Sequence, residues 1–174
     1  MKRSWKAAPV GALGFDEWLR SRGSLTVRIT GKCPDFSVRQ VSNRFARAYL
    51  DEGARIGAKR NEAVLVREVY LCCGEVPLVF AHSIAARKSL NGPWRNLKFL
   101  GQKSLGSALL SSPKVKREPL EYLSLSPRHP LYEKSCRQMQ VKPRRLWARR
   151  SLFSMGNRSI LVTEVFLPEI LAKK

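Results

Sequence analysis

The chain has 174 residues, of which 44% are hydrophobic and 9% aromatic, and Lys and Arg outnumber Asp and Glu by 33 to 13. A chain of this length buries roughly two-thirds of its unfolded surface, so its core needs no metal or disulfide. The composition excludes a fibrous or wholly disordered chain. The net charge of +20 favours an anionic partner, namely nucleic acid, an anionic membrane surface or a small anionic substrate.

Membrane and metal motifs are missing from the sequence. No apolar stretch approaches the 18 or more residues that a spanning helix needs, and the longest, 76–86, contains His82. Four cysteines are present: Cys33, Cys72, Cys73 and Cys136. They lack metal-ligand spacing, and on a strand the adjacent Cys72 and Cys73 point to opposite faces. There is also no phosphate loop or dinucleotide fingerprint. We therefore expect reduced thiols, no metal, no cofactor and a cytoplasmic protein.

The first predicted elements are helical. An apolar stripe with acidic residues near its start predicts a short helix within 11–22, ended by Gly23. A second helical turn is expected over 24–29. Residues 1–11 are interpreted as a loose tail in front of these helices.

Strand patterns follow from residue 36. An irregular strand is expected over 36–49, and the β-branched run 64–73 predicts a strong strand that turns at Gly74-Glu75 into 76–86. The later segments are two short helices at 94–100 and 104–110, an alternating segment at 114–125, a polar proline-bounded connection at 127–143, and strands at 146–155 and 160–167. This order predicts one α+β domain over 1–174, with a mostly antiparallel sheet of about six strands.

Two isolated charges lie within apolar strand patterns. Arg67 shares a face with Leu65, Val69 and Leu71, and Glu164 is the only charge from residue 160 to 168. Such charges are costly unless they are paired or engaged by a ligand. One interpretation is that Arg67 and Glu164 pair with each other, or that solvent reaches that face of the sheet.

The other interpretation of these two charges is an enclosed site. The planar guanidinium of Arg67 would bind a carboxylate through two hydrogen bonds. A buried Glu164 would transfer a proton, because desolvation raises a carboxyl pKa toward working pH.

A basic segment provides an alternative to a small-molecule site. Residues 134–158 contain eight Lys or Arg and no acid, with Trp147 and Phe153 among them. This pattern is compatible with a surface that follows phosphates and stacks bases. It is equally compatible with one solvated strand face, and the doublet Arg149-Arg150 would split between the two faces.

Several blocks in order resemble the chorismate–pyruvate lyases of ubiquinone biosynthesis. The more specific blocks are Val66-Arg67-Glu68-Val69, Leu71-Cys72, Gly74-Glu75, Pro77-Leu78-Val79-Phe80-Ala81, Leu100-Gly101, Ser104-Leu105-Gly106, Trp147-Ala148-Arg149-Arg150-Ser151 and Leu161-Val162-Thr163-Glu164-Val165-Phe166-Leu167-Pro168. Asp16-Glu17-Trp18-Leu19 and Ser24-Leu25-Thr26 are similar more loosely. Together these blocks extend over most of residues 12–168.

The resemblance implies a fold, a reaction and a set of site residues. The fold would be a six-stranded antiparallel sheet with helical flaps over an internal site. The reaction would convert chorismate to 4-hydroxybenzoate and pyruvate without a cofactor, as the first committed step toward ubiquinone. Arg67 would hold a carboxylate, Leu25 and Leu105 would act through their backbone and by closing the flaps, and Glu164 would face the ring oxygen or the leaving group.

One position departs from the family pattern. His82 stands where the family commonly has an Arg that binds substrate or organises its pocket, so His82 is also expected near the ligand, with Arg28 or Arg87 as compensating cations. Two other functions remain open, a non-catalytic module that binds a small aromatic acid and a basic RNA-associated protein. We expect a monomer with no obligatory protein partner.

Overall fold

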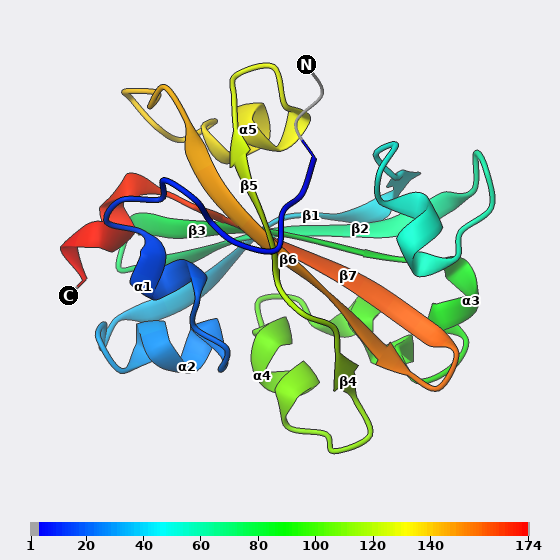
Figure 1. The fold of residues 1–174 in the computed structure, drawn as a ribbon. Helices are drawn as coiled ribbons and strands as arrows, with labels where there is room; N and C mark the ends of the chain where they lie inside the picture. Colours follow the sequence, from blue (N-terminus) through cyan, green and yellow to red (C-terminus); the bar gives the residue numbers. More distant parts are fainter. Residues whose placement is uncertain (1–3, 174) are drawn as a thin grey trace.

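In the computed structural model, which describes residues 4–173, a single twisted sheet carries short helices on both faces (Figure 1). The strands are β1 (Phe36–Arg47), β2 (Ala63–Cys73), β3 (Val76–Ala85), β4 (Lys116–Arg117), β5 (Glu121–Leu125), β6 (Leu146–Met155) and β7 (Arg158–Phe166). The helices are α1 (Asp16–Leu19), α2 (Leu25–Thr30), η1 (Gly53–Ile56), α3 (Arg87–Leu90), η2 (Arg95–Phe99), α4 (Leu105–Leu110), α5 (Pro130–Ser135) and η3 (Pro168–Ala172). None of the described helices is long and apolar enough to cross a membrane.

The strands are all antiparallel and follow the order β1-β2-β3-β7-β6-β4, with β5 also paired to β6. β4 and β5 lie one after the other along the same edge of β6, and Pro119 lies between them. Because proline has no N–H to donate, it breaks a continuous ladder. The predicted α+β antiparallel fold is confirmed, and the expected single segment at 114–125 is divided into two strands.

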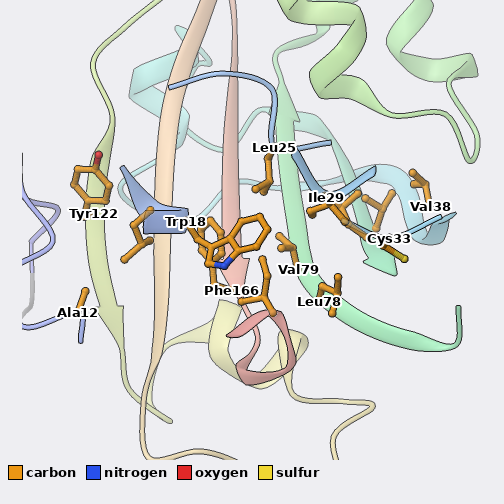
Figure 2. Packing of buried hydrophobic residues seen from close by; sticks show 14 residues of the cluster. Ala12, Trp18, Leu25, Ile29, Cys33, Val38, Leu78, Val79, Tyr122 and Phe166 are labelled. Atoms are coloured by element: carbon orange, nitrogen blue, oxygen red, sulfur yellow. The ribbon is translucent and has the colours of Figure 1, made fainter. Parts of the chain in front are cut away.

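Both faces of the central strands are covered. β2 is buried along nearly its whole length because α1, α2, α3 and α4 lie on one face and η1 and α5 on the other (Figure 1). Figure 2 shows the first face near α1 and α2, where Trp18 and Leu25 join Val79 and Phe166 in one apolar cluster. A register shift between Gln40 and Ser42 accounts for the irregular pattern expected of β1.

Three segments differ from the sequence predictions. α1 is only four residues long, and the connection predicted at 127–143 contains α5, which begins at Pro130 after His129 accepts a hydrogen bond from the N–H of Leu131. Part of the expected loose tail is paired with the sheet, because Lys6 and Tyr122 exchange two backbone hydrogen bonds. Residues 1–3 lie outside the described residues.

The prediction that the cysteines are all reduced is wrong. Cys33, three residues beyond the end of α2, forms a disulfide with Cys73 at the end of β2. Cys73 packs beside the α1–α2 cluster while Cys72 is buried in the α5 cluster, so the two adjacent side chains do point to opposite faces. The disulfide joins the α2 segment to the central hairpin.

Candidate active site

A cavity lies on the face of the sheet that carries α1, α2 and α4. It is bounded by the middle of β2, β3, β6 and β7 from below and by the starts of α2 and α4 from above. Its polar and charged lining residues are Ser24, Thr26, Arg67, Ser83, Ser104, Arg117, Arg149, Ser151 and Glu164. The apolar lining includes Leu25, Val69, Leu105 and Val162. The cavity therefore combines apolar side chains from both the sheet and the helices with a few charged and polar groups, as small-molecule sites commonly do.

Arg67 projects into this cavity from the centre of β2 and is only 2% exposed. Its Nη2 donates to the backbone oxygens of Gly101, at 2.9 Å, and Lys103, at 2.7 Å, in the segment before α4. Its Nε is buried without a hydrogen-bond partner among residues 4–173. Burial lowers the pKa of Arg67 below its ordinary value. A buried cation with an unused donor is suited to hold an anionic group of a ligand.

Glu164 lines the cavity from β7 and pairs with Arg149 on the neighbouring strand β6. The Nε of Arg149 donates a hydrogen bond to Glu164 Oε2 at 2.5 Å. The Nη1 of Arg149 also donates to three backbone oxygens, those of Trp18 and Leu19 at the end of α1 and that of Ser21 just after it. The Arg149 side chain is 1% exposed and that of Glu164 is 17% exposed. This network positions the carboxylate of Glu164 and connects it to the α1 segment.

Arg117 is a third guanidinium of the cavity wall, and it comes from the short edge strand β4. Its Nη1 donates to the backbone oxygen of Arg22 at 2.6 Å, and its guanidinium lies 5.2 Å from the ring centroid of Phe153. Burial lowers the pKa of Arg117, although the charge of Glu164 opposes that shift. The sequence prediction missed this residue, because Lys114 and Lys116 beside it hide any unusual charge pattern. The sequence carries no signal that separates Arg117 from these neighbours.

Two helical segments close the cavity on the side away from the sheet. Leu25 and Leu105 are the first residues of α2 and α4, and both are buried and line the cavity. The hydroxyls of Thr26 and Ser104 join the two segments by a hydrogen bond of 2.6 Å. The arrangement agrees with the flaps that the sequence resemblance implied.

His82 does not belong to this cavity, and its expected substrate contact is corrected. In β3, Ala81 and Ser83 face the cavity, so the residue between them points to the opposite face of the sheet. There His82 lies between two buried carboxylates, with Nδ1 3.0 Å from Glu68 Oε1 and Nε2 3.4 Å from Glu52 Oε2. Arg28 and Arg87, the proposed compensating cations, are not among the residues that line the cavity.

His82 and Glu68 belong to a row of polar residues on the face of the sheet opposite the cavity. This back-face polar row has one residue from each of six neighbouring strands, directly opposite one another in register: Ser42, Glu68, His82, Thr163, Arg150 and Glu121. Burial alone would lower the pKa of His82, but its hydrogen bonds to Glu52 and Glu68 outweigh burial and raise it. Burial opposes the shift at Glu68 also, where His82 and Lys134 lower the pKa.

The structure shows that part of the basic segment at 134–158 is buried inside the protein. Arg149 and Arg150 split between the two faces as expected, and both are buried in ion pairs, Arg150 with Asp51 and Glu121. Phe153 is only 5% exposed because it packs in the core beside α4. Neither the doublet nor this ring is therefore available to a nucleic-acid backbone or base.

The fold is an α+β domain in which a cavity lies between an antiparallel sheet and two short helices. Solved structures share the fold at low identity. The effector domain of PhnF from Mycobacterium smegmatis aligns at 11% identity, over 86% of this chain and 91% of that one, with a TM-score of 0.57. A GntR-family transcriptional regulator from Bacillus cereus aligns at 12% identity, over 78% and 93%, with a TM-score of 0.57.

Sequence relatives identify the family within this fold. The family model described as chorismate lyase matches residues 6–174. A protein of Nitrosospira multiformis named "Probable chorismate pyruvate-lyase" is 54% identical over 155 residues, covering 88% of this chain and 86% of that protein. One of the same name from Nitrosomonas europaea is 47% identical over 96% of this chain and 94% of its own length. The chain belongs to the chorismate lyase family.

Proposed function

We propose that this chain converts chorismate to 4-hydroxybenzoate and pyruvate. The observation that carries the proposal is that Arg67 and Glu164 line one cavity from different strands and do not pair with each other. The Nε of Arg67 has no hydrogen-bond partner among residues 4–173. A cation and a carboxylate that line one cavity suit a substrate whose ring carries a carboxylate and must lose a proton. The names of the relatives support the same substrate.

The reaction breaks two bonds of the substrate and involves two proton steps. The ring C4–H bond gives up its proton, the C3–O bond breaks, and the electron pair of the C–H bond completes the aromatic ring. The departing enolpyruvate takes up a proton and becomes pyruvate, so atoms and charge balance. Aromatisation supplies the driving force, and the protein mainly orients the substrate and places charge near the reacting atoms.

Each site residue has a role in this proposal. Arg67 binds the ring carboxylate, and Glu164, positioned by its hydrogen bond from Arg149, accepts the ring proton or serves the leaving group. Leu25 and Leu105 provide backbone groups and apolar contact. Since each is the first residue of its helix, its N–H has no acceptor within that helix.

Flap closure excludes water from the cavity. A dry site strengthens the contact between Arg67 and the substrate carboxylate. It also makes product release the slow step, because the hydrogen bond between Thr26 and Ser104 must open. The aromatic product would serve ubiquinone synthesis, as the family resemblance implies.

A continuous absorbance assay tests the proposal directly. Purified protein is mixed with chorismate in buffer without added metal or cofactor, and the appearance of 4-hydroxybenzoate is followed. Formation above the spontaneous rate, and its loss in Glu164→Gln, are expected. Folded protein that binds 4-hydroxybenzoate but forms none from chorismate would instead be a binding module, the role suggested by the fold of the regulator domains.

A further inference from the structure

The charges that line the cavity do not balance. Three guanidinium groups and one carboxylate line it: Arg67, Arg117, Arg149 and Glu164. The charge of Arg149 is paired with Glu164, and its Nη1 donates to three backbone oxygens. Arg67 and Arg117 are left as two cations for which no carboxylate of residues 4–173 lies within ion-pair distance.

Arg117 resembles Arg67 in having an unused donor. Its Nη1 is engaged by the Arg22 carbonyl, but its Nε is buried and has no hydrogen-bond partner within the described part of the chain. Leaving a buried charged donor unsatisfied is costly, and an anionic ligand group removes that cost. Two such cations in one cavity therefore indicate a ligand with two negative charges.

The sheet places these two cations on opposite sides of Glu164. Arg67 is on β2, Glu164 on β7 and Arg117 on β4, in the strand order β2-β3-β7-β6-β4. Four strand spacings separate β2 from β4, about 19 Å between backbones. Both arginines line the same cavity as Glu164, so a ligand bridging them would pass in front of Glu164.

We propose that Arg117 binds the enolpyruvyl carboxylate of chorismate, while Arg67 binds the ring carboxylate. This inference rests on the proposed function and goes beyond it by assigning the second anionic subsite. The C3–O bond that breaks lies between the two carboxylates, which places it beside Glu164. The product 4-hydroxybenzoate retains only the ring carboxylate, so Arg117 contacts the substrate and not this product.

The test compares a dicarboxylate with a monocarboxylate ligand in one variant. Arg117→Gln is assayed for kcat and KM with chorismate and, by calorimetry, for the Kd of 4-hydroxybenzoate. Loss of a charge-assisted hydrogen bond predicts that kcat/KM falls by roughly 10–100-fold, mostly through KM. The Kd of 4-hydroxybenzoate is expected to stay at the wild-type value, and Arg117→Lys is expected to restore part of the loss.

A matched control separates local contact from the overall charge. Arg145→Gln removes the same charge from the exposed segment before β6 and is expected to leave KM unchanged. Unchanged kinetics in Arg117→Gln would overturn the proposal. Equal losses of affinity for chorismate and 4-hydroxybenzoate, together with a lowered Tm, would also overturn it, because a purely structural residue behaves in that way.

The proposed function fails separately, if wild-type protein binds chorismate without turning it over. In that case the Kd of chorismate for wild type and Arg117→Gln decides the assignment of Arg117. Wild-type protein that binds no chorismate at all would overturn both proposals.

Discussion

Arg67 and Glu164 line the same cavity and yet do not form an ion pair. Glu164 pairs with Arg149, while Arg67 donates to the carbonyls of Gly101 and Lys103. The interpretation in which the two isolated strand charges neutralise each other is therefore wrong. Both groups line one cavity, and each is held there by a different set of partners.

Glu164→Gln should abolish most turnover and leave the protein folded. The amide can still accept from Arg149 but cannot accept a proton, so kcat is expected to fall by roughly 10²–10⁴-fold. Steady-state kinetics with chorismate measure the loss, and circular dichroism checks the fold. Turnover near the wild-type rate would remove Glu164 from the mechanism.

Arg67→Ala should weaken binding of 4-hydroxybenzoate by about 1.5–3 kcal/mol, the scale of a charge-assisted hydrogen bond. Isothermal titration gives the affinity. Because Arg67 also holds the segment at Gly101 and Lys103, a rise in the proteolytic sensitivity of that segment is expected as well. Equal affinity in wild type and variant would mean that the carboxylate binds elsewhere.

His82→Arg should leave kcat/KM unchanged, because His82 points away from the cavity. The variant should differ in the pH dependence of stability. The folded-state pKa of His82 is raised above 6.5, so its stabilisation is complete below that value and is lost as pH rises through the raised pKa. Arginine stays charged across this window.

Denaturant titrations at several pH values above 6 test the His82 prediction. Wild type is expected to lose stability with rising pH more steeply than His82→Arg. A parallel decline in both proteins would show that His82, which lies between Glu52 and Glu68, does not titrate in this range. A large loss of kcat/KM would show that the back-face polar row supports the cavity.

Reduction of the disulfide should destabilise the protein. Cys33 and Cys73 are 40 residues apart, and closing a loop of that size corresponds to about 2–4 kcal/mol of unfolding free energy. Wild-type Tm is therefore expected to fall with reductant. The Cys33→Ser, Cys73→Ser double variant serves as the control and should be insensitive to reductant. A wild-type Tm that reductant does not alter would contradict the prediction.

Thr26→Val should accelerate product release by loosening the two flaps. The variant loses the 2.6 Å hydrogen bond to Ser104, so the dissociation rate of 4-hydroxybenzoate is expected to rise up to about tenfold. Stopped-flow displacement measures this rate. Thr30→Val is the matched control, since Thr30 bonds only within α2, to the Thr26 carbonyl. Equal rates in both variants would show that this contact does not gate release.

Strand patterns allowed much of the fold to be predicted, and isolated charges singled out two residues that line the cavity. The run at 64–73 specifies β2 because its apolar residues continue on both faces. Arg67 and Glu164 were recognisable because each interrupts such a run. Charge in an apolar strand has few explanations, so these positions pointed to a site before any contact was known.

Other features depend on tertiary contacts that the local pattern does not encode. The Cys33–Cys73 disulfide exists because the end of α2 packs beside the end of β2. His82 was assigned through resemblance, although alternation with Ala81 and Ser83 and pairing with Glu68 across the hairpin would have placed it on the back face. Arg117 could not be distinguished from the basic residues around it.

Consecutive residues of β2 serve opposite faces of the sheet, and their charges are opposite. Arg67 faces the cavity, and Glu68 faces the back-face polar row. A one-residue slip of β2 would exchange them, because strand side chains alternate with a period of two. The cavity would then present a carboxylate where it now presents a guanidinium, and would repel an anion. The length of the turn at Gly74-Glu75 fixes this register, and it therefore determines whether the cavity favours a negatively or a positively charged ligand.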